Sequence, residues 1–403
     1  MLHILSLVLI FFALLALLVL THELGHFLVS RLLGVKVEEF GFGLPPRLIG
    51  IVKIKDSEKK RKYWKIIHKY SKIYYQNKEP ISSIYSLNAI PFGGFVKIFG
   101  EDGEARHDSQ SFAAQKVSRR FLILIAGIVM NFILGVLLFT IGYWSGFPEI
   151  IEDNVNFKNA KVQVLNVSPG SPSEAAGMKT GDTIRLVILP NNEKVAIDKV
   201  NTLQSISKSH AGQKLTIEVL RGNDIYRFNV EPRVSPPEGQ GALGIFPARI
   251  GIMKYPILEA LKMSIAESFQ LIWIMYDYLK TIIERLAQAQ KVSVDVSGPI
   301  GIVVLTNQFR EMGFPYLLKF AGLISLNLAF INFIPYPALD GGRILFLLIE
   351  KIKGRPVSPR LEQAIHTIGL YSLLLLMIII TFKDISRFHD KFAMLWERIN
   401  PFH

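Results

Sequence analysis

Hydrophobic residues gather into long runs along this chain, and polar stretches separate the runs. An α-helix needs about 20 mainly apolar residues to cross the hydrocarbon core of a bilayer. Four runs approach or exceed that length, and they predict membrane-spanning helices at residues 4–20, 121–144, 316–335 and 364–382. The pattern is therefore typical of a polytopic α-helical membrane protein with four transmembrane helices.

The first run could instead be the hydrophobic core of a signal peptide. However, no basic residue precedes this run, and no small-x-small cleavage site follows it. Apolar residues also resume after the polar sequence HELGH and continue to Leu33. We therefore expect a retained first span within residues 1–34.

The third span is expected to be broken. Pro335 and Pro337 stop its helix, and a short apolar helix, ILFLLIEKI, follows them. We assign residues 316–350 to this broken segment. The fourth span at 364–382 then leads into a C-terminal tail at 383–403.

Residues 256–288 are also apolar, but a charged residue interrupts them every few positions. A charge at the centre of a bilayer costs about 2.5–3.5 kcal/mol even on a mild insertion scale. We therefore expect residues 245–315 to contain amphipathic helices, which lie on the membrane or on the protein, and a connecting segment.

The hydrophobic and polar residues of segment 158–235 follow a different periodicity. Short alternating segments, VQVLNV, DTIRLVIL, LTIEVL and YRFNV, are separated by Gly, Pro, Asn and Asp, which predicts a small β-rich domain. The string SPGSPSEAAGMKTGDTI within it resembles the PDZ module of bacterial envelope proteases. Any other small β-rich domain is the alternative interpretation.

Composition and charge refine this picture. Of 403 residues, 50% are hydrophobic and 20% are charged, so soluble parts must accompany the spans. The absence of cysteine excludes a disulfide framework and thiolate metal ligands. The net charge of +13 is compatible either with nucleic-acid binding or with basic cytoplasmic loops of a membrane protein.

The distribution of the basic residues favours the membrane interpretation. Residues 31–120 contain eighteen Lys and Arg against nine Asp and Glu, and residues 350–363 are also basic. By the positive-inside rule both loops are cytoplasmic. Region 145–315 and both termini should then lie outside the cytoplasm, and we expect no nucleic-acid partner.

The cytoplasmic loop 35–120 contains a strongly basic segment at residues 53–80. A solvated basic loop is one interpretation. The other is a patch on anionic inner-leaflet lipid with aromatic side chains at the interface. The aromatic residues concerned are Tyr63, Trp64, Tyr70, Tyr74 and Tyr75.

The sequence HELGH, residues 22–26, is a candidate zinc site. His22 and His26 are four residues apart and share one helical face, so both imidazoles can bind one metal ion. Glu23 lies beside them, where it can accept a proton from a water that zinc activates. Asp340 is a candidate third ligand, because a carboxylate at membrane depth is costly unless it meets a cation. Asp340 can also cap the helix that starts at Gly341, and the two roles are compatible because they use different oxygens.

HELGH at the end of the first span, with NxxPxPxLDG in a later one, resembles the site-2 protease family of intramembrane zinc metalloproteases, in particular its regulator-of-sigma-E protease branch. Further similar stretches, in order along nearly the whole chain, are GFG at 41–43, IPFGGFVKI at 90–98, GIVMN at 127–131, VSGPIGI at 296–302 and LDGGRILFLLIEKIKGRPVS at 339–358. The chain departs from the best-known relatives in three ways: it has one apparent PDZ module instead of two, no Pro after Gly127, and the basic segment 53–80.

The resemblance implies roles for individual residues. It implies that His22, His26 and Asp340 bind one Zn²⁺ per chain and that Glu23 is the catalytic base. It implies that Asn327 and Asn332 contact substrate near the metal. A β-hairpin at 90–98 would re-enter the membrane and pair with an unwound substrate strand, and its candidate substrate-binding residues are Gly93, Gly94, Phe95 and Val96.

The expected fold is thus four transmembrane helices with a re-entrant β-hairpin and an inserted PDZ domain. The implied activity is cleavage of transmembrane segments of single-span proteins, such as anti-sigma factors or remnant signal peptides, in the bacterial inner membrane. The active site would be near the cytoplasmic side, and the PDZ domain would contact peptides or substrate domains outside. A catalytically inactive PDZ scaffold is the main alternative. A transporter with broken helices is a third, but the halves of the chain show no internal repeat.

Overall fold

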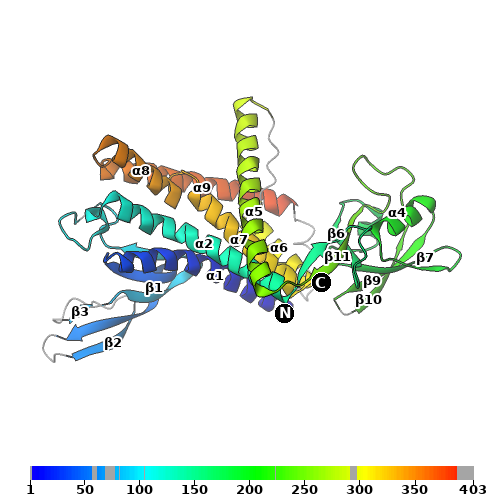
Figure 1. Cartoon of the computed structure of the whole chain (residues 1–403), viewed down its shortest axis with the longest axis horizontal. Coiled ribbons are helices and arrows are strands. Elements are labelled where there is room, and N and C mark those ends of the chain that lie inside the picture. The colour runs from blue at the N-terminus through cyan, green and yellow to red at the C-terminus, as the bar shows by residue number, and fades with distance from the viewer. Residues whose placement is uncertain are drawn as a thin grey trace, which may run out of the picture. The chain divides into compact units, whose positions relative to one another are not determined.

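The computed structural model describes residues 2–56, 61–68, 78–80, 82–103, 105–222, 224–290 and 297–387. The chain forms two compact units, which are described separately (Figure 1). Unit 1 comprises Met1–Leu137, Ile265–Val303 and Ala321–His403, and unit 2 comprises Leu138–Ser264 and Val304–Phe320.

Four helices are long and apolar enough to cross a membrane, as the hydrophobic runs predicted. They are α1 (Leu2–Leu32), α2 (Val117–Ser145), α7 (Phe314–Phe333) and α9 (Pro359–Arg387). The helix α1 continues without a break through HELGH, so the polar motif is part of the same helix as the apolar run. The prediction of four spans is confirmed.

Small residues allow α1 and α2 to pack closely within unit 1. A Cβ atom added at Gly25 of α1 would collide with the carbonyl of Ala126 and lie 2.8 Å from Cγ of Met130 in α2. Helix α7 also packs on α2, because the Ser325 hydroxyl donates a 2.7 Å hydrogen bond to the carbonyl oxygen of Asn131. Such close backbone approach is the usual basis of helix association in membranes.

The first sheet belongs to unit 1 and follows α1. Its strands are β1 (Val37–Asp56), β2 (Arg61–Ile67), β3 (Lys78–Pro80) and β4 (Ile84–Ile98). Both β1 and β4 fold back on themselves, so Phe40 pairs with Val96 on one side and with Tyr85 on the other. The segment 94–98 pairs only with β1 among the described residues, and its other edge carries no strand.

The basic segment 53–80 thus contributes β2, β3 and the end of β1 to this sheet. Val52, Ile54 and Ile67 form a small buried core on one face. On the opposite face of the sheet, the Trp64 side chain is 56% exposed. Tyr70, Tyr74 and Tyr75 lie outside the described residues, so the proposed aromatic interface is described only in part.

A sharp turn joins α7 to α8 (Asp340–Lys353). Helix α7 ends at Phe333, just before Pro335 and Pro337, and the next helix already begins at Asp340. A Cβ at Gly341 would collide with the carbonyl of Ile334, and one at Gly342 with the carbonyl of Tyr336. Only glycines therefore allow α8 to begin against the turn that precedes it.

The remaining helices are α5 (Ile257–Ala287) and α6 (Pro299–Met312), with a short 3₁₀ turn, η2, at Phe112–Ala114. The charged positions in α5 keep it outside the set of candidate spans. It is a single continuous helix, and its placement on the membrane or on the protein stays a prediction.

Unit 2 is built on a seven-stranded sheet with strand order β10-β9-β7-β6-β11-β5, and β8 pairs with β7. The strands are β5 (Phe147–Ile150), β6 (Lys161–Val167), β7 (Thr183–Ile188), β8 (Lys194–Ala196), β9 (Leu215–Arg221), β10 (Asp224–Val230) and β11 (Ile245–Met253). The helices α3 (Pro172–Ala175) and α4 (Val200–Ser209) complete it. The sheet extends beyond the expected limits 158–235, because β5 and β11 belong to it.

The string SPSEAAGMKTGD has clear local roles in unit 2. The Ser171 side chain caps α3 by accepting a 3.1 Å hydrogen bond from the backbone N–H of Glu174. Asp182 is fully buried, and it accepts hydrogen bonds from the backbone N–H of Lys179 and from the guanidinium of Arg221. Asp182 in turn raises the pKa of Arg221. These interactions tie the turn before β7 to the end of β9.

Candidate metal centre

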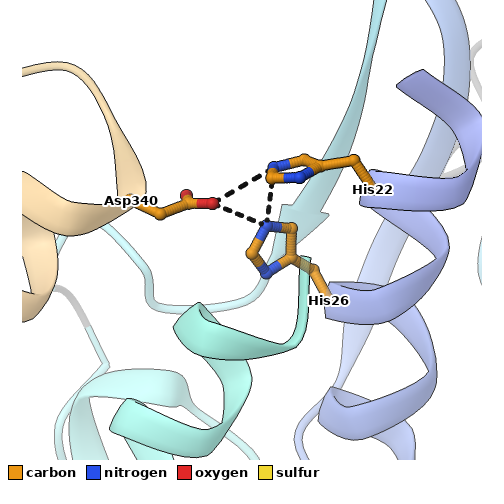
Figure 2. Close-up of side chains that lie close together, drawn as sticks. All are labelled: His22, His26 and Asp340. Carbon is orange, nitrogen blue, oxygen red and sulfur yellow. Dashed lines mark hydrogen bonds and ion pairs between the residues drawn. The ribbon is translucent and has the colours of Figure 1, made fainter. Parts of the chain in front are cut away.

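Three polar side chains meet inside unit 1. His22 and His26 extend from α1 one helical turn apart, and Asp340 extends from the start of α8 (Figure 2). Asp340 Oδ2 lies 3.1 Å from His22 Nε2 and 3.3 Å from His26 Nε2, and the two Nε2 atoms are 3.3 Å apart. The structure therefore brings together all three ligands that the sequence suggested, although more than 300 residues separate HELGH from Asp340.

The spacing of these three atoms fits a zinc ion. Zinc binds imidazole nitrogen and carboxylate oxygen at about 2.0–2.1 Å in tetrahedral geometry, which places neighbouring ligand atoms roughly 3.3 Å apart. The observed separations of 3.1–3.3 Å match that edge. Asp340 Oδ2 is buried without a hydrogen-bond donor, so a cation is the partner that its position requires. Three protein ligands leave a fourth position open, as catalytic zinc sites do.

The second nitrogen of each imidazole has a different environment. His26 Nδ1 lies 2.8 Å from the carbonyl oxygen of Ile123 in α2. An N–H at Nδ1 donates to this carbonyl, so the lone pair of His26 is at Nε2 and points to the centre of the cluster. His22 Nδ1 is buried and has no partner among the described residues.

The carboxylate is held by the turn before α8. Asp340 is the first residue of α8, its N-cap is Leu339, and no side-chain capping bond forms, so the capping interpretation of Asp340 is wrong. Ala338 adopts a positive φ of 76°, and its backbone N–H donates a 2.9 Å hydrogen bond to His366 Nδ1 of α9. His366 lies within the apolar run 364–382. Nothing in its neighbours pointed to this contact, because the partner is a backbone group.

Gly127 of α2 forms a wall of the cluster. A Cβ atom added there would lie 2.7 Å from Cε1 and 2.9 Å from Nε2 of His22, and it would also collide with His26. Ideal close-packed side chains do not approach so closely. Residue 127 must therefore be glycine if both imidazoles are to keep their positions.

Glu23 contacts the first sheet. The backbone N–H of Val96 lies close enough to the Glu23 carboxylate to act on it electrostatically. Gly94 is also adjacent, since a Cβ added to it would lie 3.4 Å from Cγ of Glu23. The candidate base thus lies between the two histidines in sequence and beside the open edge of β4 in space.

The other candidate residues lie close in sequence to these groups, but they make fewer contacts. Asn327 and Asn332 are partly buried in α7, and neither forms a hydrogen bond with the cluster in the described part of the chain. Gly93 has a positive φ of 94° at the turn within β4, and Phe95 pairs with Gly41. Their contribution to substrate binding stays a prediction.

Comparison with known proteins is consistent with a zinc site. The model of peptidase family M50 matches residues 10–64 and 73–376. A protein of Clostridium perfringens named as a zinc metalloprotease is 33% identical, with 93% of this chain and 98% of that protein aligned. A similarly named protein of Clostridium acetobutylicum is 33% identical over 91% of this chain and 94% of its own length. The zinc metalloprotease RasP of Geobacillus kaustophilus is 26% identical, with 92% and 96% aligned.

Replacing Gly127 with alanine should weaken zinc binding. The added methyl group would push both imidazoles away from Asp340, and we expect the affinity for zinc to fall at least about tenfold, as for other disturbed metal-site environments. Competition with a chelator on the purified protein measures the effect. Gly241→Ala is the matched control, because a Cβ at Gly241 meets no atom within 4 Å. Equal affinities for the two variants would contradict the assignment of this wall.

Replacing Asp340 with asparagine should also weaken zinc binding by a factor of about ten or more, because a neutral amide is a poor substitute for a carboxylate ligand. Zinc content at a fixed free-zinc concentration and proteolytic activity are the two readouts. If both are unchanged, the third ligand is another residue.

Proposed function

We propose that this chain, which belongs to peptidase family M50 and is a bacterial zinc metallopeptidase, cleaves peptide bonds within the membrane. Zinc is its cofactor, and its apolar helices give it a bilayer environment. In this proposal His22, His26 and Asp340 bind the zinc, and Glu23 is the catalytic base. The finer points of substrate, orientation and regulation are developed below.

One observation carries the proposal: three ligand atoms with the spacing of a tetrahedral zinc site come together from α1, a candidate membrane span, and from the start of α8. Their side chains are only 9–17% exposed. Burying two imidazoles and a carboxylate costs too much free energy to persist without a function or a bound cation. HELGH lies in the C-terminal half of α1, and hydrolysis requires that water reach it there.

The proposed chemistry divides the work between the metal and Glu23. A bound zinc would act as a Lewis acid that activates water and polarises the scissile carbonyl. Glu23 accepts the proton that the attacking water loses, and it delivers a proton to the departing amine as the C–N bond breaks. The Nδ1–H of His26 is held by Ile123, so this imidazole keeps its orientation during the reaction.

The open edge of β4 is suited to hold the substrate. A peptide bond in a helix is protected by the i to i−4 hydrogen bond, so an intramembrane protease must unwind its substrate. Residues 94–98 offer an edge without a strand partner, beside Glu23. The Phe99 N–H donates to the Lys36 carbonyl on the β1 side. Strand alternation therefore turns the N–H groups of Gly94, Val96 and Ile98 toward the open edge. An unwound segment that pairs with them would lie next to the zinc.

This arrangement supports the interpretation of residues 90–98 as a re-entrant hairpin. Unpaired backbone groups within a bilayer are costly, and an unwound substrate segment has the same unpaired groups. Mutual pairing would satisfy both. The substrate class implied is the transmembrane segment of a single-span protein, such as an anti-sigma factor or a remnant signal peptide.

Unit 2 is proposed to be a PDZ module that lies outside the cytoplasm. Support comes from the capped SPSEAAGM helix, the buried Asp182 turn and a cavity of about 330 Å³ between α4 and the start of β11. In keeping with the basic loops 31–120 and 350–363, the zinc site would be near the cytoplasmic face. Unit 2 would then exclude substrates with bulky external domains instead of taking part in cleavage.

The rival function, a catalytically inactive scaffold, has less support. An inactive relative has no need of either the base or the complete ligand set, yet Glu23 and all three ligands are present and in register. The zinc metalloprotease names of the aligned relatives also favour an enzyme.

Glu23→Gln should abolish proteolysis while zinc remains bound. The amide cannot accept a proton, and loss of a general base typically lowers the rate about 100-fold or more. Cleavage of a tagged single-span substrate by the reconstituted protein, with parallel zinc analysis, tests this. Retained cleavage would remove Glu23 from the mechanism, and lost zinc would show that Glu23 is a ligand.

Val96→Pro should impair substrate binding without loss of zinc. Proline removes the edge N–H and resists pairing with a new strand. We expect KM for a helical substrate to rise at least about tenfold, and a substrate with Gly near the scissile bond should be rescued only in part. Val96→Ala keeps the N–H and is the control. A fall in kcat at constant KM would instead indicate that Val96 serves Glu23 alone.

Replacing residues 158–235 with a short Gly-Ser linker should let an untrimmed single-span protein be cleaved, because the proposed size filter is lost. The β5–β11 ladder, in which Ile150 pairs with Ile250, is kept in this variant. Short remnants should be cut at the wild-type rate. If their cleavage stops, unit 2 recruits substrate and does not filter it.

A further inference from the structure

A buried amide in α2 has no partner among the described residues, and it lies one helical turn beyond Gly127, which contacts both histidines. Asn131 is fully buried within a candidate membrane span. Neither its Oδ1 nor its Nδ2 has a hydrogen-bond partner among the described residues. An unsatisfied amide at membrane depth is costly, and each such group in a folded protein requires an explanation. Leucine would fill the same space without that cost.

A second unsatisfied atom lies on the facing helix. His22 Nδ1 is buried without a partner, whereas the equivalent atom of His26 donates to the Ile123 carbonyl. Imidazoles that bind metal almost always donate their other N–H to an acceptor, which fixes the tautomer and the ring orientation. His22 therefore lacks, within α1, the group that a zinc-binding histidine needs.

The register of α1 against α2 places these orphan groups together. His26 contacts Ile123, while His22, one turn earlier in α1, contacts Gly127, one turn later in α2. The helices thus run antiparallel here. Asn131 is four residues beyond Gly127 and lies on the same face of α2. Helical side chains lean toward the N-terminus, so the Asn131 amide extends back over the turn that contacts the His22 ring.

We propose that Asn131 is a positioning residue for the zinc ligand His22. The Nδ1–H of His22 donates to one buried water, and this water donates to Asn131 Oδ1, which leaves the Nε2 lone pair directed at the metal. His22 Nδ1, Asn131 Oδ1 and Asn131 Nδ2 together offer the two to four polar partners that a buried water needs. Asn131 touches neither substrate nor metal in this role. The inference rests on the proposed function, because it takes His22 as a ligand.

Asn131→Leu distinguishes this role from packing. Leucine has nearly the same size, so the thermal stability of the metal-free protein should be unchanged or higher. The affinity for zinc should nevertheless fall roughly 10–100-fold, the usual effect of removing a group that orients a metal ligand. Asn131→Asp keeps the acceptor oxygen and should restore the affinity. Ser325→Ala, which removes the hydrogen bond to the Asn131 backbone, is the matched control and should keep wild-type affinity.

A double-mutant cycle tests whether the effect passes through His22. Zinc affinity is measured by chelator competition on the purified full chain. In a His22→Ala background, Asn131→Leu should not lower the zinc affinity further. In a His26→Ala background, it should lower the zinc affinity by the same factor as in the wild-type protein. Equal losses in both backgrounds would show a general structural role and overturn the inference. So would unchanged zinc affinity with a raised KM, which would make Asn131 a substrate-binding residue.

The same measurements separate the two proposals. If His22→Ala leaves zinc affinity unchanged, the ligand assignment fails and the role of Asn131 falls with it. If His22→Ala abolishes tight binding but Asn131→Leu does not weaken it, only the inference about Asn131 is wrong, and the zinc site stands.

Discussion

The close approach of two imidazoles and a carboxylate, a group that could hold a metal ion, constrains the rest of unit 1. Each of these groups is expensive to bury alone, and together they are stable only around a positive ion. The cluster therefore depends on the packing of α1, α2 and α8 to within a few tenths of an ångström. Gly127, Gly341 and Gly342 lie so close to neighbouring atoms that a Cβ atom at any of these positions would collide with them.

Around that cluster the chain uses backbone groups where side chains would not fit. The carbonyl of Ile123 orients His26, and the N–H of Ala338 is held by His366. The backbone of Gly94 lies against the Glu23 side chain. Backbone groups are rigid parts of a helix, turn or strand, so they position their partners with little loss of side-chain entropy. The precision of the site thus comes from secondary structure, and the functional side chains are few.

The open edge of β4 and the buried base form one feature. The edge is a liability in most proteins, because unpaired N–H and C=O groups attract other strands. In this chain the unpaired edge of β4 lies beside Glu23, the proposed catalytic base. A segment that forms hydrogen bonds with this edge would therefore also lie beside the proposed base. The fold back of β1 and β4 on themselves leaves residues 94–98 as the outer segment of the sheet, where an added strand has room on one side.

The sequence by itself determined the four spans, the broken third span and the pair of histidines, because these depend on local composition and on helical spacing. It also singled out Asp340, because a carboxylate in an apolar stretch is anomalous wherever the chain later folds. Only the tertiary structure decided that Asp340 does not cap α8, that Gly127 lines the histidines and that His366 supports the turn. It alone showed β5 and β11 in the sheet of unit 2. These features depend on contacts between residues far apart in the chain. Several of them also involve a backbone carbonyl or the Cα of a glycine, and the pattern of side chains along the sequence does not indicate such contacts.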